Sequence, residues 1–202
     1  ETLYLREGEK NRRGGLLAAA AMKTALPIEL ASDPERPVRD PAGAPESRGD
    51  VLIFDTAPLT RDLTVAGDAT AVIYASCDCR DFDLWVRMLD VHPDGRAFNL
   101  MSAGNDVVRA SYRDPASGPK ALEPGRLYEL RVPTLMTANR FGKGHRIRVQ
   151  VSGSFDPHLS RNLQTGESEV ASSTSRTARI EIHQGGDRAS KLLLPLLVER
   201  ES

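Results

Sequence analysis

The 202-residue sequence has few aromatic residues and no long apolar run. Aromatic residues make up 5% of the chain, with Trp85 as the one tryptophan and four tyrosines, so few rings are available for stacking on a sugar. A bilayer-spanning helix needs about 20 consecutive apolar residues, and no run approaches that length. The apolar stretch Leu16–Met22 is also too short, and it lacks the layout of a signal peptide. We therefore expect no membrane contact.

The charge is balanced and shows no basic stripe. The chain carries 27 Lys and Arg against 28 Asp and Glu, for a formal net charge of -1. Nucleic-acid binding depends on clustered cations that neutralise phosphates, so we expect no nucleic-acid partner. No glycine-rich phosphate loop precedes a helix, and we expect no cofactor.

The only two cysteines, Cys77 and Cys79, are one residue apart. On a strand they would point to the same face, and a disulfide at this spacing is geometrically unfavourable. A zinc site would need two further ligands, and no Cys or His stands nearby at a suitable spacing. We therefore expect two reduced thiols and no metal, which favours the cytoplasm as the compartment.

The first 50 residues differ from the rest of the chain. Residues 2–5 (TLYL) resemble a short strand, whereas residues 33–50 carry four prolines that block helix and supply few ladder donors. We predict an N-terminal strand and a Pro/Gly-rich extended arm over residues 1–50, with a short helix at residues 16–26.

From residue 51 the pattern is strand after strand. Residues 146–151 (RIRVQV) alternate Ile147, Val149 and Val151 with polar residues, as expected of a half-exposed strand. Eight or nine such segments, separated by Gly/Pro/Asp turns, predict an all-β sandwich over residues 51–202. The long gaps between some strands favour sheet-crossing connections of the jelly-roll type.

A histidine and an aspartate lie close together in the stretch RMLDVHPDGRAFNL, residues 87–100. Pro93 suits the first central turn position, Asp94 the second, and Gly95 accepts the left-handed conformation that follows. The stretch therefore predicts a β-hairpin with a glycine bulge, and His92 is left available to contact a partner domain.

The sequence does not contain a recognisable hydrolase site of its own. The Gly-x-Ser-x-Gly elbow of α/β-hydrolases is absent, and Ser154 lies near His158 without an orienting acid or an oxyanion hole in view. Asp81 and Asp83 could bind calcium, but they also suit surface ion pairs at a strand start. We predict no catalytic residue and no metal ligand, and we place Trp85 in a core or an interface.

In order along the chain, several motifs resemble the C-terminal domain of the X-Pro dipeptidyl-peptidase and cocaine esterase (CocE/NonD) family of serine hydrolases. These are DFDLWVRMLDVHPDGRAFNL, LEPGRLYELRV, the run GHRIRV…S…RN…TG from Gly144 to Gly166, and the closing LLLPLL. They cover about residues 51–198. In addition, DPERPV, residues 33–38, resembles the linker that precedes this domain in the family.

The resemblance implies a galactose-binding-like jelly roll that packs against an α/β-hydrolase domain of the same polypeptide. In such enzymes the catalytic triad lies in that other domain, so we expect this chain alone to be inactive and the parent protein to cleave esters or amides. Its role would be to stabilise the catalytic domain and shape the substrate pocket, with Trp85 and His92 as interdomain contacts. An exposed apolar docking face would also allow self-association of the isolated chain.

A second function stays open on the sequence alone. Jelly-roll sandwiches host many binding sites, and the fold by itself does not decide between them. The alternative is a stand-alone module that binds a carbohydrate or another ligand.

Overall fold

The computed structural model describes residues 1–8, 15–39, 49–102, 104–157 and 160–197. These ranges contain no α-helix, and single turns of 3-10 helix occur at η3 (Ala110–Tyr112), η4 (Pro115–Ser117) and η5 (Gly186–Arg188). None of the described helical turns has the length and apolar character that a membrane crossing needs.

The rest of the regular structure is β-strand. The described residues form twelve strands, which is more than the eight or nine expected from the sequence, because several are only three to five residues long. They are β1 (Thr2–Arg6), β2 (Gly15–Ala18), β3 (Ile28–Ser32), β4 (Val51–Asp55), β5 (Leu63–Cys77), β6 (Asp83–Val91), β7 (Ala97–Asn99), β8 (Val107–Arg109), β9 (Tyr128–Phe141), β10 (Arg146–Ser152), β11 (Ala178–Ile182) and β12 (Lys191–Leu193).

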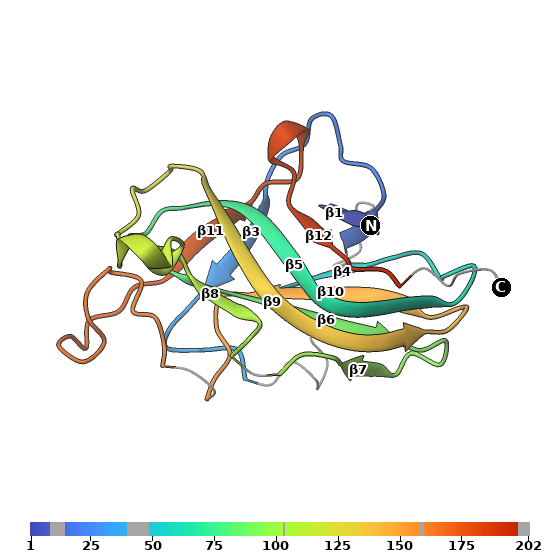
Figure 1. Cartoon of the computed structure of the whole chain (residues 1–202). Helices are drawn as coiled ribbons and strands as arrows, with labels where there is room; N and C mark the ends of the chain where they lie inside the picture. Colours follow the sequence, from blue (N-terminus) through green and yellow to red (C-terminus); the bar gives the residue numbers. More distant parts are fainter. Residues whose placement is uncertain (9–14, 40–48, 103, 158–159, 198–202) are drawn as a thin grey trace.

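The strands form two packed layers. The hydrogen-bonded order is β3-β11-β5-β12-β1-β2-β4-β10-β6-β7, with β9 on the free side of β5 and β8 beside β6. In Figure 1 the long strands β5 and β9 cross in front of β6 and β10. One hydrophobic cluster fills the space between the layers and joins residues of β5 and β9 to residues of β6 and β10. The predicted all-β jelly-roll sandwich is confirmed.

Strand β10 lies in the middle of its layer. It pairs antiparallel with β4 on one side and with β6 on the other. Ile147, Val149 and Val151 belong to the buried core, as their alternation predicts. The sequence predicts that the opposite face is exposed, and this is wrong in part. Gln150 on that face is buried, and Arg148 there pairs with Asp55 of β4.

The first 39 residues lie along the sandwich as an extended arm and complete its sheet. β1 pairs with β12 and β2, β2 runs parallel to β4, and β3 pairs with β11. Leu5, Leu17 and Leu30 belong to the same core cluster as the later strands. The short helix expected at residues 16–26 is wrong, because β2 gains backbone partners on both sides and its Leu17 side chain enters the core. This tertiary pairing outweighs the helical preference of an alanine-rich segment.

Candidate functional site

The stretch that first suggested a site folds as a hairpin between β6 and β7. The His92 amide donates to the Arg96 carbonyl oxygen at 2.8 Å, and the Gly95 amide donates to the His92 carbonyl oxygen at 2.9 Å. Gly95 has a φ of 88°, the left-handed conformation expected of it. Asp94 accepts from the Arg96 amide at 3.1 Å and from the Arg96 guanidinium at 2.7 Å, and these two bonds lower the pKa of its carboxyl group. Asp94 is therefore a turn residue, and it takes no part in a catalytic pair with His92.

His92 lies at the surface of this hairpin. Its side chain keeps 32% of its exposure, and its ring contacts those of Phe98 and His145, with centroid separations of 4.7 and 4.2 Å. The sequence singled out His92 as an interdomain contact. In this structure its nearest polar neighbours come from the same domain: His145, and Asp90 two residues earlier on β6.

Trp85 is buried inside the domain. It is 3% exposed, and its ring packs against that of Phe155 with centroids 5.1 Å apart. Phe155 also lies under the Arg87 guanidinium, at 4.0 Å. The loop that carries Phe155 thus covers the indole, so a contact between Trp85 and another domain stays a prediction.

Ser76 on β5 lies close to Glu181 on the paired strand β11 and to His183, the residue that follows β11. The Ser76 hydroxyl lies 3.1 Å from His183 Nε2 and 3.0 Å from Glu181 Oε2. Burial lowers the pKa of His183, which favours its neutral form. In a catalytic triad the acid orients the histidine, whereas here Glu181 bonds to the serine hydroxyl itself. The geometry is that of a hydrogen-bonded patch on a sheet, and the other sequence candidate, His158, lies outside the described residues.

The two cysteines are free, in keeping with the thiols expected from the sequence, and both are buried. Their sulfur atoms lie 2.9 Å apart at the end of β5. The hydrogen bond between them lowers the pKa of Cys77 and raises that of Cys79. Both groups face the core, where the Cys79 thiol also donates to the Asp81 carbonyl oxygen.

The motif residues around Asn162 attach a long loop to the sandwich. The Asn162 amide donates to Asp83 of β6 at 3.0 Å, and Asp83 also receives two bonds from Arg109 of β8. Gln164, next in the motif, donates to Ser32 of β3 at 2.6 Å. Asp83 is therefore a buried anchor for this loop that pairs with Arg109, and the expected surface ion pair with Arg80 or Arg87 is wrong because both aspartates are buried. Its neighbour Asp81 accepts from Ser111, and burial raises the pKa of that carboxyl group.

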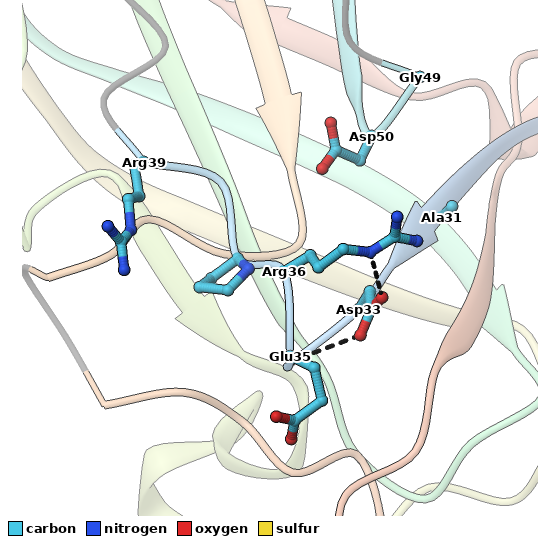
Figure 2. Close-up of a pocket in the computed structure, with 8 residues that line it drawn as sticks. Ala31, Asp33, Glu35, Arg36, Arg39, Gly49 and Asp50 are labelled. Carbon is cyan, nitrogen blue, oxygen red and sulfur yellow. Dashed lines mark hydrogen bonds and ion pairs between the residues drawn. The ribbon is translucent and has the colours of Figure 1, made fainter.

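A surface pocket of about 570 Å³ lies between residues 31–39 of the arm and Gly49 and Asp50, which directly precede β4. Figure 2 shows its charged lining, in which the Asp33 carboxylate bonds both the Arg36 guanidinium and the Glu35 amide. These bonds lower the pKa of Asp33. Arg36 and Arg39 are highly exposed, and Arg39 pairs with Asp156 of the loop. The lining is formed by Ala31, Asp33, Glu35, Arg36, Pro37, Arg39, Gly49 and Asp50.

The backbone holds this segment of the arm in place. The Val38 amide donates to the Ser154 hydroxyl at 2.8 Å, and the Asp156 amide donates to the Val38 carbonyl oxygen at the same distance. The Arg161 guanidinium caps the Pro34 carbonyl oxygen. The linker-like sequence at residues 33–38 is thus attached to the loop that carries the Gly144–Gly166 motif.

Comparison with known families decides the assignment. The model of the X-Pro dipeptidyl-peptidase C-terminal non-catalytic domain matches residues 2–193. This chain belongs to that family. The match begins at β1, so the arm over residues 1–39 is part of the domain that the family model describes.

Similar proteins are hydrolases that are much longer than this chain. Cocaine esterase of Rhodococcus sp. (strain MB1 Bresler) is 36% identical over 165 residues, which is 81% of this chain and 27% of the esterase. The solved aminopeptidase of a marine sediment Thaumarchaeota archaeon matches with a TM-score of 0.83 and 27% identity, over 98% of this chain and 37% of that one. A solved α-amino acid ester hydrolase matches with a TM-score of 0.81 and 26% identity, over 97% and 36% of the two chains. The chain therefore spans about a third of the length of these relatives.

The polar cluster at the end of the sandwich was not found from the sequence. Asp90, His92 and His145 place one donor atom each within 4.8 Å of one another, and they are the one group of this kind among the residues that the structure describes. Only His92 was singled out in advance. The spacing Asp90-x-His92 puts two side chains on one strand face, but His145 joins them only through the pairing of β6 with β10, which the sequence does not reveal.

Proposed function

We propose that this domain is the non-catalytic partner of an α/β-hydrolase domain in the same polypeptide, which cleaves esters or amides. The observation that carries the proposal is the family match over residues 2–193, in a chain that spans only about a third of its hydrolase relatives. The Ser76 group supports it, because its glutamate does not orient its histidine as a triad requires. The catalytic nucleophile would then lie outside these 202 residues.

We assign the pocket-shaping role to the arm between β3 and β4. Arg36, Arg39 and Glu35 are exposed at a concave surface, while Asp33 and Val38 are fixed by bonds to neighbouring backbone and to the loop. A fixed backbone that presents exposed charged side chains is suited to contact a neighbouring domain or a polar part of its substrate. Residues 33–39 and 49–50 include no aromatic residue, so contacts there would be polar and ionic.

The isolated 202-residue chain is expected to show no hydrolysis of p-nitrophenyl acetate above the buffer rate. Initial rates are measured by release of p-nitrophenolate across a range of chain concentrations, with circular dichroism to show that the chain is folded. The positive control is the full-length gene product, whose turnover should be abolished by a sulfonyl fluoride that modifies serine. Turnover by the chain alone that scales with concentration and is lost on Ser76→Ala would overturn the proposal.

A further inference from the structure

The group formed by Asp90, His92 and His145 lies at one end of the interior between the two layers. Asp90 follows Leu84, Val86 and Met88 on the core-facing side of β6, and it is itself buried. His145 directly precedes β10, where Arg146 is paired with Val91 of β6. Extending this register by one residue places His145 opposite His92. The three side chains thus come from two adjacent hairpin ends, β6–β7 and β9–β10.

Both imidazoles lie close to the Asp90 carboxylate, one at each of its oxygens, and one donor atom from each of the three residues lies within 4.8 Å of the others. His145 Nδ1 lies 2.8 Å from Asp90 Oδ1, and His92 Nε2 lies 3.8 Å from Asp90 Oδ2. Ligand bonds of about 2.0–2.2 Å in a tetrahedron place donor atoms roughly 3.3–3.6 Å apart. For one Asp90 oxygen to act as a ligand beside both nitrogens, His145 would have to move away from Oδ1 by roughly 0.5 Å, and His92 would have to turn toward the same oxygen. His92 is at a partly exposed turn, where its side chain is able to make such an adjustment.

The charge of Asp90 is balanced by neither lysine nor arginine in the described part of the chain. Its ion-pair partners there are the imidazoles of His92 and His145. Its remaining bond comes from the neutral amide of Asn139 on β9, at 3.2 Å. A buried carboxylate without a fixed cation is costly, and a divalent ion would supply the missing charge.

Neighbouring residues orient the side chains of the group. The Asn139 side-chain amide donates to Asp90 Oδ2 and fixes the plane of the carboxylate. Metal-binding side chains are commonly oriented in this way by a hydrogen bond from a residue that does not itself touch the metal. Gly142 has no side chain, and a Cβ there would lie 3.1 Å from His145 Nε2, so a larger residue would crowd the imidazole. Pro93 of one hairpin lies beside Gly144 of the other, since a Cβ at Gly144 would lie 3.5 Å from Pro93 Cγ.

From this arrangement we propose that Asp90, His92 and His145 bind a divalent first-row transition ion of the zinc type, with water in the open position. Two imidazole nitrogens and one carboxylate oxygen suit zinc, cobalt or nickel, whereas calcium and magnesium prefer oxygen ligands throughout. The ion would join the two hairpin ends and close this end of the core. It would do so without contributing to ester hydrolysis, so this proposal does not depend on the proposed function.

Binding of zinc and cobalt to the metal-free 202-residue chain tests the proposal. Calorimetric titration with Zn²⁺ should show one ion bound per chain. Co²⁺ bound in its place should produce the visible absorption bands of a four-coordinate cobalt site. His92→Ala and His145→Ala should each weaken Zn²⁺ binding at least about tenfold, because each removes a ligand. Asp94→Asn is the matched control, since it removes a carboxylate from the same hairpin without touching the group, and its affinity should stay within about twofold.

Two further results decide the matter even where a variant folds poorly. X-ray absorption of the zinc-loaded wild-type chain should show two imidazole ligands and an oxygen shell that includes one carboxylate. Loss of binding in the histidine variants with an unchanged circular dichroism spectrum would support the site. Absence of stoichiometric binding by the wild type, or equal binding by a His92→Ala/His145→Ala double variant, would overturn it.

Discussion

Replacing Arg87 by methionine is expected to lower the free energy of unfolding by about 3–5 kcal/mol. The Arg87 guanidinium donates from Nε and Nη2 to Asp106 Oδ2, at 3.1 and 2.9 Å. The Arg87 side chain is 8% exposed and that of Asp106 is 0% exposed. Methionine fills a similar volume but leaves the Asp106 carboxylate buried without its cation, and that uncompensated charge is the source of the loss.

Urea denaturation followed by circular dichroism measures this loss. The matched control is Arg96→Met, which breaks the exposed pair between Arg96 and Asp94 and should change stability by less than about 1 kcal/mol. The double variant Arg87→Met/Asp106→Leu removes both charges and should recover most of the stability lost by the single one. A loss below about 1 kcal/mol for Arg87→Met would show that this pair does not carry the stability assigned to it.

Replacing Phe54 by alanine is expected to lower the free energy of unfolding by about 3–5 kcal/mol, because it leaves a cavity in the core. Phe54 is one of the largest fully buried side chains, and it lies on β4 opposite Gly15 of β2. A Cβ at Gly15 would lie 2.2 Å from the Phe54 ring, so the ring occupies the space that a side chain on β2 would fill. The ring thus holds the N-terminal arm against the sandwich.

Thermal unfolding and limited proteolysis together test this role. The exposed Met136 on β9 gives a control, because Met136→Ala removes a side chain of comparable length from the surface and should change stability by less than about 0.5 kcal/mol. Phe54→Ala should lower the melting temperature by roughly 6–20 °C and speed cleavage within the first 39 residues. An unchanged cleavage rate in the arm would mean that Phe54 does not hold it.

The sequence predicts those parts of the fold whose pattern is local. The alternation at Ile147, Val149 and Val151 indicates a strand with one core face, and the Pro93-Asp94-Gly95 turn predicts the hairpin that joins β6 to β7. Both are determined by residues within one short segment. The motif resemblance extends this to the whole domain, because it supplies the jelly-roll arrangement that local patterns do not fix.

What the sequence does not predict depends on contacts between distant segments. β2 is a strand because Gly15 and Leu16 meet Phe54 and Asp55 across 39 residues, which overrides the preference of its alanines. The group at Asp90 and His145 forms for a similar reason, since only the register of β6 against β10 brings them together. The burial of Gln150 likewise follows from the central position of its strand, which period-two alternation alone does not indicate.

The position of the reactive serine tests the central claim most directly. A fluorophosphonate probe is reacted with the full-length gene product, and the labelled peptide is located by mass spectrometry after digestion. The account predicts a label on a serine outside these 202 residues, lost when the enzyme is first inactivated by a sulfonyl fluoride, and no label on the isolated chain. A stoichiometric label on a serine within the domain, such as Ser76 or Ser154, would contradict its assignment as a non-catalytic partner.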